Sequence, residues 1–345
     1  TQNQIYRLTE NKYVGNIVTI LHVYRCILCV HPWKMGNYST ISEFILVGVT
    51  SDPTMQIFLY IFFTLVYIIT ILGNSGIVFI ILIIPDLHSP MYFFLGNLSI
   101  SDLCYSTVII PKLLHDMFLL RKSITFIGCA IQLYCFALFA TTEGFMLSAM
   151  AYDRYVAICN PLLYIVIMNR RTCILLVSVV YAGGFIIAGI HTSATISLHF
   201  CGPNTINHFY CDIPPLMDLS CSDPYFIFIL GFFSVTVVLA SYIYIFFTIF
   251  QIRSVEGRHK AFSTCAAHLS CVALFYGTVF FMYLRPASNY SVTQDKVVSI
   301  FYTVIIPMLN PIIYSLRNKE VKEAVRSSKV CYHKRKYKHV FCAAK

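Results

Sequence analysis

The residues of this sequence best able to do chemistry are charged groups inside apolar runs or at their ends. Asp153 and Arg154 adjoin at the end of one such run, within residues 150–164 (MAYDRYVAICNPLLY). A guanidinium at the end of an apolar helix is costly unless it is paired or reaches the lipid headgroups, and Asp153 can supply the counter-charge. Taken alone, the pair is an interfacial ion pair that anchors a helix end.

Two carboxylates, Asp102 and Glu143, interrupt otherwise apolar segments at 91–120 and 124–152. Ionisable groups inside a membrane segment are expensive, so each is a candidate functional residue. The alternative is a protonated acid that is hydrogen-bonded in a helix interface. The residues themselves leave both interpretations open.

Cysteines and histidines are the next candidates. Four cysteines fall on one predicted face of the membrane, and four cysteines in an oxidising compartment can pair in three ways: Cys129, Cys201, Cys211 and Cys221. Cys26 and Cys29 lack a second pair, and no metal site is expected there or at His268. The sequence also has no HExxH, GxSxG or phosphate-binding glycine loop, which argues against an enzyme.

The elements that position these groups are membrane helices. Of 345 residues, 58% are hydrophobic and 12% are charged, against about a quarter charged in soluble proteins. Mean hydropathy is +0.72. Seven apolar segments each supply the ~20 residues that cross a bilayer: about 57–84, 91–120, 124–152, 172–196, 224–252, 261–284 and 297–316.

The net charge of +10 reflects topology rather than nucleic-acid binding. Sixteen of the 25 lysines and arginines lie on one side of a seven-span arrangement, five lie on the other, and four lie in the first 34 residues. This positive-inside bias places the C-terminus in the cytoplasm and the segment before the first span outside. The basic excess also favours contact with anionic lipid.

The chain is divided into the helix bundle and the segments before and after it. Residues 1–34 are interpreted as an upstream extension or a disordered segment, because the first methionine is Met35. Residues 35–56 form the outer N-terminus, 57–316 the helix bundle, 317–330 an amphipathic helix along the membrane and 331–345 a cytoplasmic tail. Asn37 begins an N-glycosylation sequon that overlaps a myristoylation pattern, and the charge bias selects the sequon.

Five strings in order carry a family resemblance: LHSPMYFFL, MAYDRY, SY, KAFSTC and PMLNPIIYSLRN. They resemble the signatures of olfactory receptors, in the rhodopsin-like G-protein-coupled receptor family, and of the tetrapod class II branch in particular. The resemblance spans about residues 37–325. It implies an all-α membrane protein, a seven-transmembrane-helix bundle followed by a short cytoplasmic amphipathic helix. Phe275-Tyr276-Gly277 stands where most rhodopsin-like receptors have a Trp and a Pro, which fits the olfactory branch.

The resemblance also implies a function. A small volatile odorant binds in the outer half of the bundle, and a stimulatory olfactory-type G protein then raises cyclic AMP. The positions that match the family's ligand cavity are apolar with a few hydroxyls, which favours a neutral, mainly hydrophobic ligand: Phe136, Ala137, Ala140, Thr141, Ile227, Leu230, Tyr276, Val279, Phe280, Tyr283, Ile300 and Thr303. Plain helix packing is the alternative role for each.

Further roles come from the resemblance alone. It implies the disulfides Cys129–Cys211 and Cys201–Cys221. Asn74, Asp102 and Glu143 are expected to form a polar core, which could hold a sodium ion or a shared proton. The residues expected to couple the bundle to the G protein are Asp153, Arg154, Tyr155, Tyr242, Asn310, Pro311 and Tyr314.

Two other functions stay open. A seven-span transporter would be expected to show inverted repeats or a chain of intramembrane charges, which we do not find. A small-molecule receptor outside olfaction shares most of the motifs. The expected location is the plasma membrane, and the cilia of olfactory sensory neurons by resemblance. The partners are an odorant, a heterotrimeric G protein and membrane lipid, with no nucleic acid.

Overall fold

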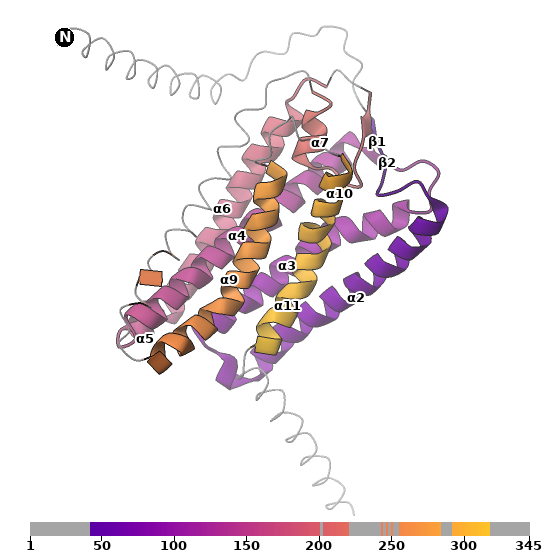
Figure 1. Cartoon of the computed structure of the whole chain (residues 1–345). Helices are drawn as coiled ribbons and strands as arrows, with labels where there is room; N and C mark the ends of the chain where they lie inside the picture. The colour runs from indigo at the N-terminus through magenta and orange to yellow at the C-terminus, as the bar shows by residue number, and fades with distance from the viewer. Residues whose placement is uncertain are drawn as a thin grey trace, which may run out of the picture. The chain divides into compact units, whose positions relative to one another are not determined.

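The computed structural model describes residues 42–200, 203–220, 243, 246, 247, 250, 255–283 and 292–317, all within one compact unit, Ser42–Lys345. Long helices run side by side through this unit (Figure 1). The segments predicted for residues 1–34 and 331–345, the sequon at Asn37 and nearly all of the amphipathic helix 317–330 lie outside the described residues.

Apolar sequence and well-defined caps produce four long helices in the first part of the bundle. Asp52 accepts hydrogen bonds from the backbone N–H groups of Thr54 and Met55, at 2.8 and 3.1 Å, just before Pro53 starts the first of them. A carboxylate cap followed by proline is a strong helix-start combination. The four helices are α2 (Pro53–Ile83), α3 (Pro90–Asp116), α4 (Phe126–Cys159) and α6 (Arg170–Ile196).

The later helices are α9 (Val255–Tyr283), α10 (Val292–Ile300) and α11 (Ile306–Arg317). A π-helical turn, Phe301–Ile305, joins α10 to α11 in one continuous rod. Pro307 has no N–H group, so it cannot donate the hydrogen bond that an α-helix would direct to the carbonyl of Thr303. The wider turn lies directly before this proline and changes the rotation of the residues that precede it.

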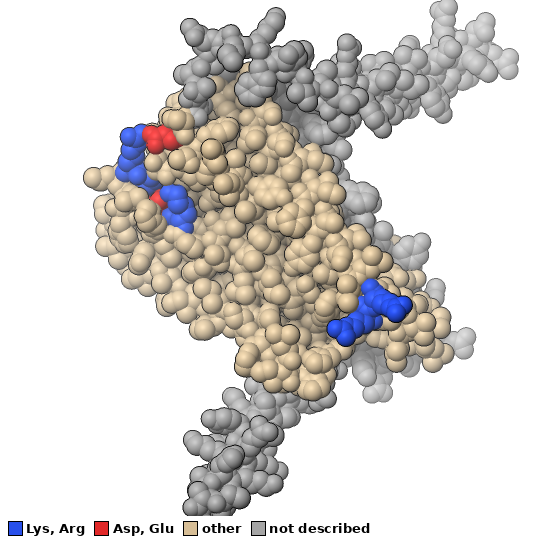
Figure 2. Space-filling model, turned by 180° about the vertical axis from the view of Figure 1, so that it is seen from behind, with Lys and Arg blue, Asp and Glu red and all other residues tan. Residues whose placement is uncertain are grey.

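Five helical segments in the described part of the chain are long and apolar enough to cross a membrane: Pro53–Ile83, Pro90–Asp116, Phe126–Cys159, Arg170–Ile196 and Thr293–Tyr314. α9 contributes a shorter apolar stretch, His268–Val279. Together these match the predicted spans except the fifth, 224–252, of which only four helical positions are described. Figure 2 shows a face whose charged side chains gather near its two ends, with an uncharged band between. The all-α membrane bundle is therefore confirmed.

A small sheet that the sequence did not reveal lies at one end of the bundle. Its strands are β1 (Glu43–Leu46), β2 (Ser123–Thr125) and β3 (Thr205–Ile206). β1 is central, antiparallel to β2 and parallel to β3. Because Ser123–Thr125 pair as a strand, the third span begins at Phe126 rather than at residue 124.

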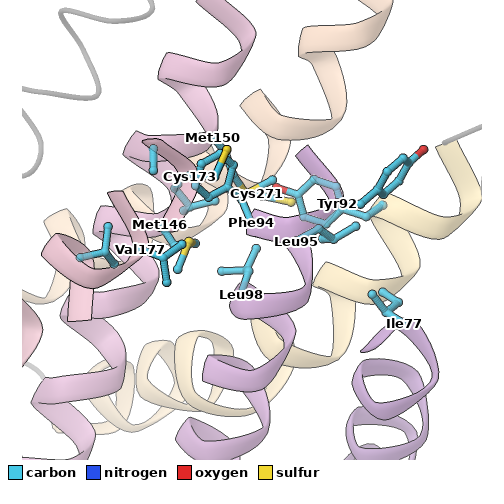
Figure 3. Packing of buried hydrophobic residues seen from close by; sticks show 14 of the residues in the cluster. Ile77, Tyr92, Phe94, Leu95, Leu98, Met146, Met150, Cys173, Val177 and Cys271 are labelled. Carbon is cyan, nitrogen blue, oxygen red and sulfur yellow. The ribbon is translucent and has the colours of Figure 1, made fainter. Parts of the chain in front are cut away.

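We call the end with this sheet and the short helix α7 (Ile213–Met217) the lid end. The opposite end carries two other short helices, α5 (Tyr164–Ile167) and η1 (Pro85–Leu87), and is called the α5 end (Figure 1). One buried hydrophobic cluster serves each end. Figure 3 shows part of the α5-end cluster, where side chains from α2, α3, α4, α6 and α9 meet.

Candidate functional site

Asn310 joins the two intramembrane carboxylates. Its side-chain amide on α11 donates to Oδ2 of Asp102 on α3 at 3.0 Å and to Oε1 of Glu143 on α4 at 3.2 Å. All three side chains are buried. Three helices therefore meet at one polar centre inside an otherwise apolar bundle.

Asn74 on α2 supports the same centre from the other side of α11. Its amide donates to the backbone oxygens of Thr70 and Pro307, both at 3.0 Å. The contact with Pro307 uses a carbonyl close to the π turn. A neighbouring glycine makes the approach possible, because a Cβ atom on Gly73 would lie 3.0 Å from Cγ of Pro311.

The polar centre has unused acceptors. Oδ1 of Asp102, Oε2 of Glu143 and Oδ1 of Asn74 have no hydrogen-bond partner among the described residues. Buried carboxylate oxygens without donors favour either a bound cation or a shared proton. Carboxylate and amide oxygens are the ligands that hard cations such as sodium prefer, so the residues present fit the expected ion. No three His, Cys, Asp or Glu residues in the described ranges form a metal-binding group, so amide or water oxygens would have to complete the shell.

The Asp153–Arg154 pair lies near the α5 end of α4. Nε of Arg154 is 3.8 Å from Oδ2 of Asp153, whose side chain is 1% exposed. The other carboxylate oxygen, Oδ1, accepts a 2.7 Å hydrogen bond from the hydroxyl of Tyr164 on α5. Burial and the nearby carboxylate raise the pKa of the Tyr164 hydroxyl, which keeps it a donor. Sequence reasoning assigned Tyr164 no role, and its position at the end of the DRY-containing string was the available signal.

The other predicted coupling residues are divided between this end and the polar centre, where Asn310 lies. Tyr314 belongs to the α5-end cluster and Tyr155 packs against it. Pro311 is buried on α11. Tyr242 lies outside the described residues.

The predicted ligand set is not brought together in one place by its described members. Phe136, Ala140 and Ile300 belong to the lid-end cluster or pack against it. Tyr276 belongs to the α5-end cluster, and its hydroxyl donates to the carbonyl of Gly144 at 3.1 Å.

The remaining members of the set lie elsewhere. Ala137 packs with Leu138 and Ala188, Val279 packs against the α5-end cluster, and Thr141 is half-buried on α4. Thr303 is buried and donates to the carbonyl of Ser299 at 2.6 Å. Four members fall outside the described residues or side chains: Ile227, Leu230, Phe280 and Tyr283.

Aromatic rings surround Phe136 at the lid end. Its ring centroid lies 5.4 Å from that of Tyr105, 5.3 Å from Tyr210 and 6.0 Å from Tyr302. Such distances are typical of stabilising aromatic pairs. Tyr210 and Tyr302 were not in the predicted set, because nothing in the sequence shows that a loop residue and a helix residue converge on Phe136.

The loop that carries Tyr210 is tied to α4. Cys129 and Cys211 form a disulfide, which is the pairing that the family resemblance implies. The second implied pair, Cys201–Cys221, lies outside the described residues. Beside the disulfide, the backbone N–H of Cys211 donates to Oε1 of Gln132 at 3.0 Å.

His208 adds a neutral polar group to this loop. Burial lowers the pKa of His208 to about 3, with a further lowering from the charge of Lys296. Its Nε2 lies 3.1 Å from Oγ of Ser299 on α10. The imidazole is therefore uncharged near neutral pH and joins the loop to the last helix by a neutral hydrogen bond.

Comparison with known proteins identifies the family. Residues 63–331 match the family model described as olfactory receptor. The chain belongs to the olfactory receptor family. The receptor is 53% identical to olfactory receptor 5AP2 of Mus musculus over 298 residues, which cover 84% of this chain and 94% of the relative.

Other relatives agree. Olfactory receptor 8U3 of Mus musculus is 51% identical over 300 residues, covering 85% of this chain and 94% of its own. Olfactory receptor 5AP2 of Homo sapiens is 51% identical over 298 residues, with 84% and 94% covered. The receptor is therefore a rhodopsin-like, odorant-sensing G-protein-coupled receptor that crosses the membrane several times.

Proposed function

We propose that the receptor binds a small, mostly hydrophobic volatile molecule in the lid half of the bundle and activates a stimulatory olfactory-type G protein, which raises cyclic AMP. The observation that carries this proposal is that three layers of residues follow one another along two of the long helices: an aromatic layer at the lid end, the polar centre, and a layer at the α5 end. On α4 the layers are represented by Phe136, Glu143 and Arg154; on the last rod they are represented by Tyr302, Asn310 and Tyr314.

The spacing of these layers suits a transmitted signal. Phe136 and Arg154 lie 18 positions apart on one helix, or about 27 Å at 1.5 Å per residue. A ligand beside Phe136 cannot touch Arg154, so its effect has to pass through a rearrangement of packed helices. The Asn310 centre lies between the two layers and bonds to both α3 and α4, so a shift of α11 changes its contacts.

The chemistry near Phe136 supports a neutral ligand. Of the described members of the predicted set, Phe136, Ala140 and Ile300 provide aromatic and aliphatic surface at the lid end, and Thr141 and Thr303 carry hydroxyls on the same two rods. Apolar cavities with a few hydroxyls hold uncharged molecules that carry one or two hydrogen-bonding groups. We propose that the wall of the ligand cavity is completed by the members on the fifth and sixth spans: Ile227, Leu230, Phe280 and Tyr283.

The α5 end supports a protein partner. Leu162, Ile165 and Val166 are strongly exposed there, near the Asp153–Arg154 pair. Contiguous exposed apolar side chains mark sites that contact another protein or the membrane. In the proposed mechanism Arg154 is held by Asp153 at rest, is freed toward Tyr242 on activation, and the C-terminal helix of the G protein enters the opened gap.

Topology and location are part of the proposal. The positive-inside bias supports an outer lid end and a cytoplasmic α5 end, with Asn37 glycosylated outside. The receptor would then reside in the plasma membrane of olfactory cilia, in contact with lipid. A sodium ion, when present, would supply positive charge to Asp102 and Glu143.

A screen tests the proposal. Cells that express residues 35–345 are exposed to chemically diverse volatiles while cyclic AMP is recorded. The expected result is a saturable rise for some neutral volatiles, blocked by loss of the stimulatory G protein. Ligand flux without a second messenger would show a transporter instead, and a response confined to non-volatile ligands would show a receptor outside olfaction.

A further inference from the structure

The loop between α6 and the fifth span covers the lid-end cluster, and its described part has three different attachments. We call residues 205–217, which include β3 and α7, the lid segment. One attachment is to β1, through the pairing of β3 and the backbone hydrogen bond from Gly48 to His208. A second is to α4, through the Cys129–Cys211 disulfide and the hydrogen bond from Cys211 to Gln132. The third is to the last helical rod, where the described hydrogen bonds join side chains.

Asp212 lies at the centre of the third attachment. Its carboxylate is fully buried, and Oδ2 accepts hydrogen bonds from the hydroxyl of Tyr210 at 2.8 Å and from that of Tyr302 at 2.7 Å. Oδ1 accepts from the backbone N–H of Ile213 at 2.7 Å. Three donors therefore converge on one carboxylate, which is the arrangement that stabilises a buried negative charge.

A second set of hydrogen bonds leads to the same carboxylate. Ser299 on α10 lies 3.1 Å from Nε2 of His208 and donates to the hydroxyl oxygen of Tyr302 at 3.4 Å. The hydroxyl protons of Ser299 and Tyr302 are thus directed in sequence toward Asp212. The side chains of Ser299 and Tyr302 on the rod, and those of His208 and Tyr210 in the lid segment, are therefore linked to this carboxylate by hydrogen bonds.

The attachment also fixes the two tyrosine rings that pack on Phe136. Tyr210 belongs to the lid segment and Tyr302 to the π turn Phe301–Ile305, and both rings contact Phe136. If the carboxylate is removed, the described contacts that remain between the lid segment and the rod are the His208–Ser299 hydrogen bond, the contact between the hydroxyls of Tyr210 and Tyr302, and ring packing. The disulfide would still hold Cys211 to α4 and β3 would still pair with β1, so the lid would loosen rather than detach.

We propose that Asp212 is a positioning residue that latches the lid segment to the last helical rod and thereby limits the access of small molecules to the side chains packed around Phe136. The inference rests on the proposed function, because it takes these side chains to line the odorant cavity. The latch itself can be tested without any odorant or signal, so its failure is distinguishable from failure of the proposed function.

The first test measures hydrogen exchange in purified full-length receptor. Tyr302→Phe keeps the ring and removes one hydrogen bond to Asp212, and Asp212→Asn removes the charge. Tyr105→Phe is the matched control, because Tyr105 stacks on Phe136 from α3. We expect amides of residues 205–217 to exchange about ten-fold faster or more in both latch variants, as for loss of one hydrogen bond to a charged group, and at the wild-type rate in the control. Wild-type exchange in the latch variants would overturn the proposal.

The second test measures how readily a small reagent reaches the side chains packed around Phe136. Ala140, which packs against the lid-end cluster, is replaced by cysteine, and its modification by methyl methanethiosulfonate is followed by mass spectrometry. Adding Tyr302→Phe or Asp212→Asn should raise the modification rate several-fold, whereas adding Tyr105→Phe should leave it unchanged. Equal rates in all backgrounds, even with a loosened lid, would contradict a latch that controls entry.

Discussion

The hydroxyl of Tyr164 donates a 2.7 Å hydrogen bond to Oδ1 of Asp153, the carboxylate whose other oxygen faces Arg154. A short loop helix thus orients the counter-charge of the proposed switch. Because the bond uses only one carboxylate oxygen, Asp153 can hold Tyr164 and Arg154 at the same time.

This relationship predicts graded constitutive activity. Asp153→Asn removes the charge that holds Arg154 and should raise ligand-independent cyclic AMP several-fold. Tyr164→Phe removes only the orienting bond and should raise it less, in the same direction. The measurement is basal cyclic AMP normalised to surface receptor. Basal signalling at or below the wild-type level in both variants would contradict a resting role for the pair.

The Asn310 centre predicts a functional rather than a folding defect. Asp102→Asn or Glu143→Gln changes the charge at a site that three helices share, so agonist potency should shift while surface expression persists. Asn310→Ala removes both hydrogen bonds, and its effect should be smaller in an Asp102→Asn background, because the two residues act as one unit. Loss of surface receptor as the sole effect would assign these residues a structural role.

Close packing of α4 on α6 predicts a stability difference between two glycines. A Cβ atom on Gly184 would lie 2.5 Å from Oγ1 of Thr142 and 3.3 Å from the backbone oxygen of Leu138, whereas one on Gly189 would meet nothing within 4 Å. Gly184→Ala should therefore destabilise the receptor by about 1–3 kcal/mol, and Gly189→Ala should not. Thermal unfolding of the two purified variants in the same detergent makes the comparison, and equal melting temperatures would refute it.

The lid should loosen in acid because of His208. Its pKa is about 3 when the lid is docked and returns to about 6.5 when the side chain reaches water. The stability that depends on the neutral ring is complete above pH 6.5 and is lost as pH falls toward 3. At pH 5 the free energy that stabilises the docked lid has fallen by about 2 kcal/mol.

His208→Gln supplies the control for this pH dependence, because glutamine can donate to Ser299 and does not titrate. Hydrogen exchange of residues 205–217, corrected for intrinsic rates, is compared between pH 7 and pH 5. The wild-type lid should show the larger acid-induced increase. An equal increase in the variant would assign the effect to other groups.

Part of this arrangement could be predicted from the sequence. Apolar runs indicate the spans, because crossing a bilayer requires about 20 such residues whatever the fold. Asp102 and Glu143 stand out because a carboxylate is rare in such runs. The adjacent pair of Asp153 and Arg154 required no knowledge of the fold at all.

Contacts between distant residues could not be predicted in the same way. Asn310 lies 208 positions from Asp102, and Tyr302 lies 90 positions from Asp212, so no local spacing indicates either hydrogen bond. Strands as short as Thr205–Ile206 carry no detectable alternation. The π turn rotates the residues around Thr303 relative to an ideal α-helix, and no pattern in the sequence marks this turn.

The central claim is that a ligand at the lid end acts through Arg154 at the other end of α4. The most direct test uses Arg154→Ala with a volatile that activates the wild type, and measures both its binding to purified receptor and cyclic AMP in cells with matched surface expression. The account predicts binding within a few-fold of the wild type and no rise in cyclic AMP. Signalling at the wild-type level in this variant would contradict it.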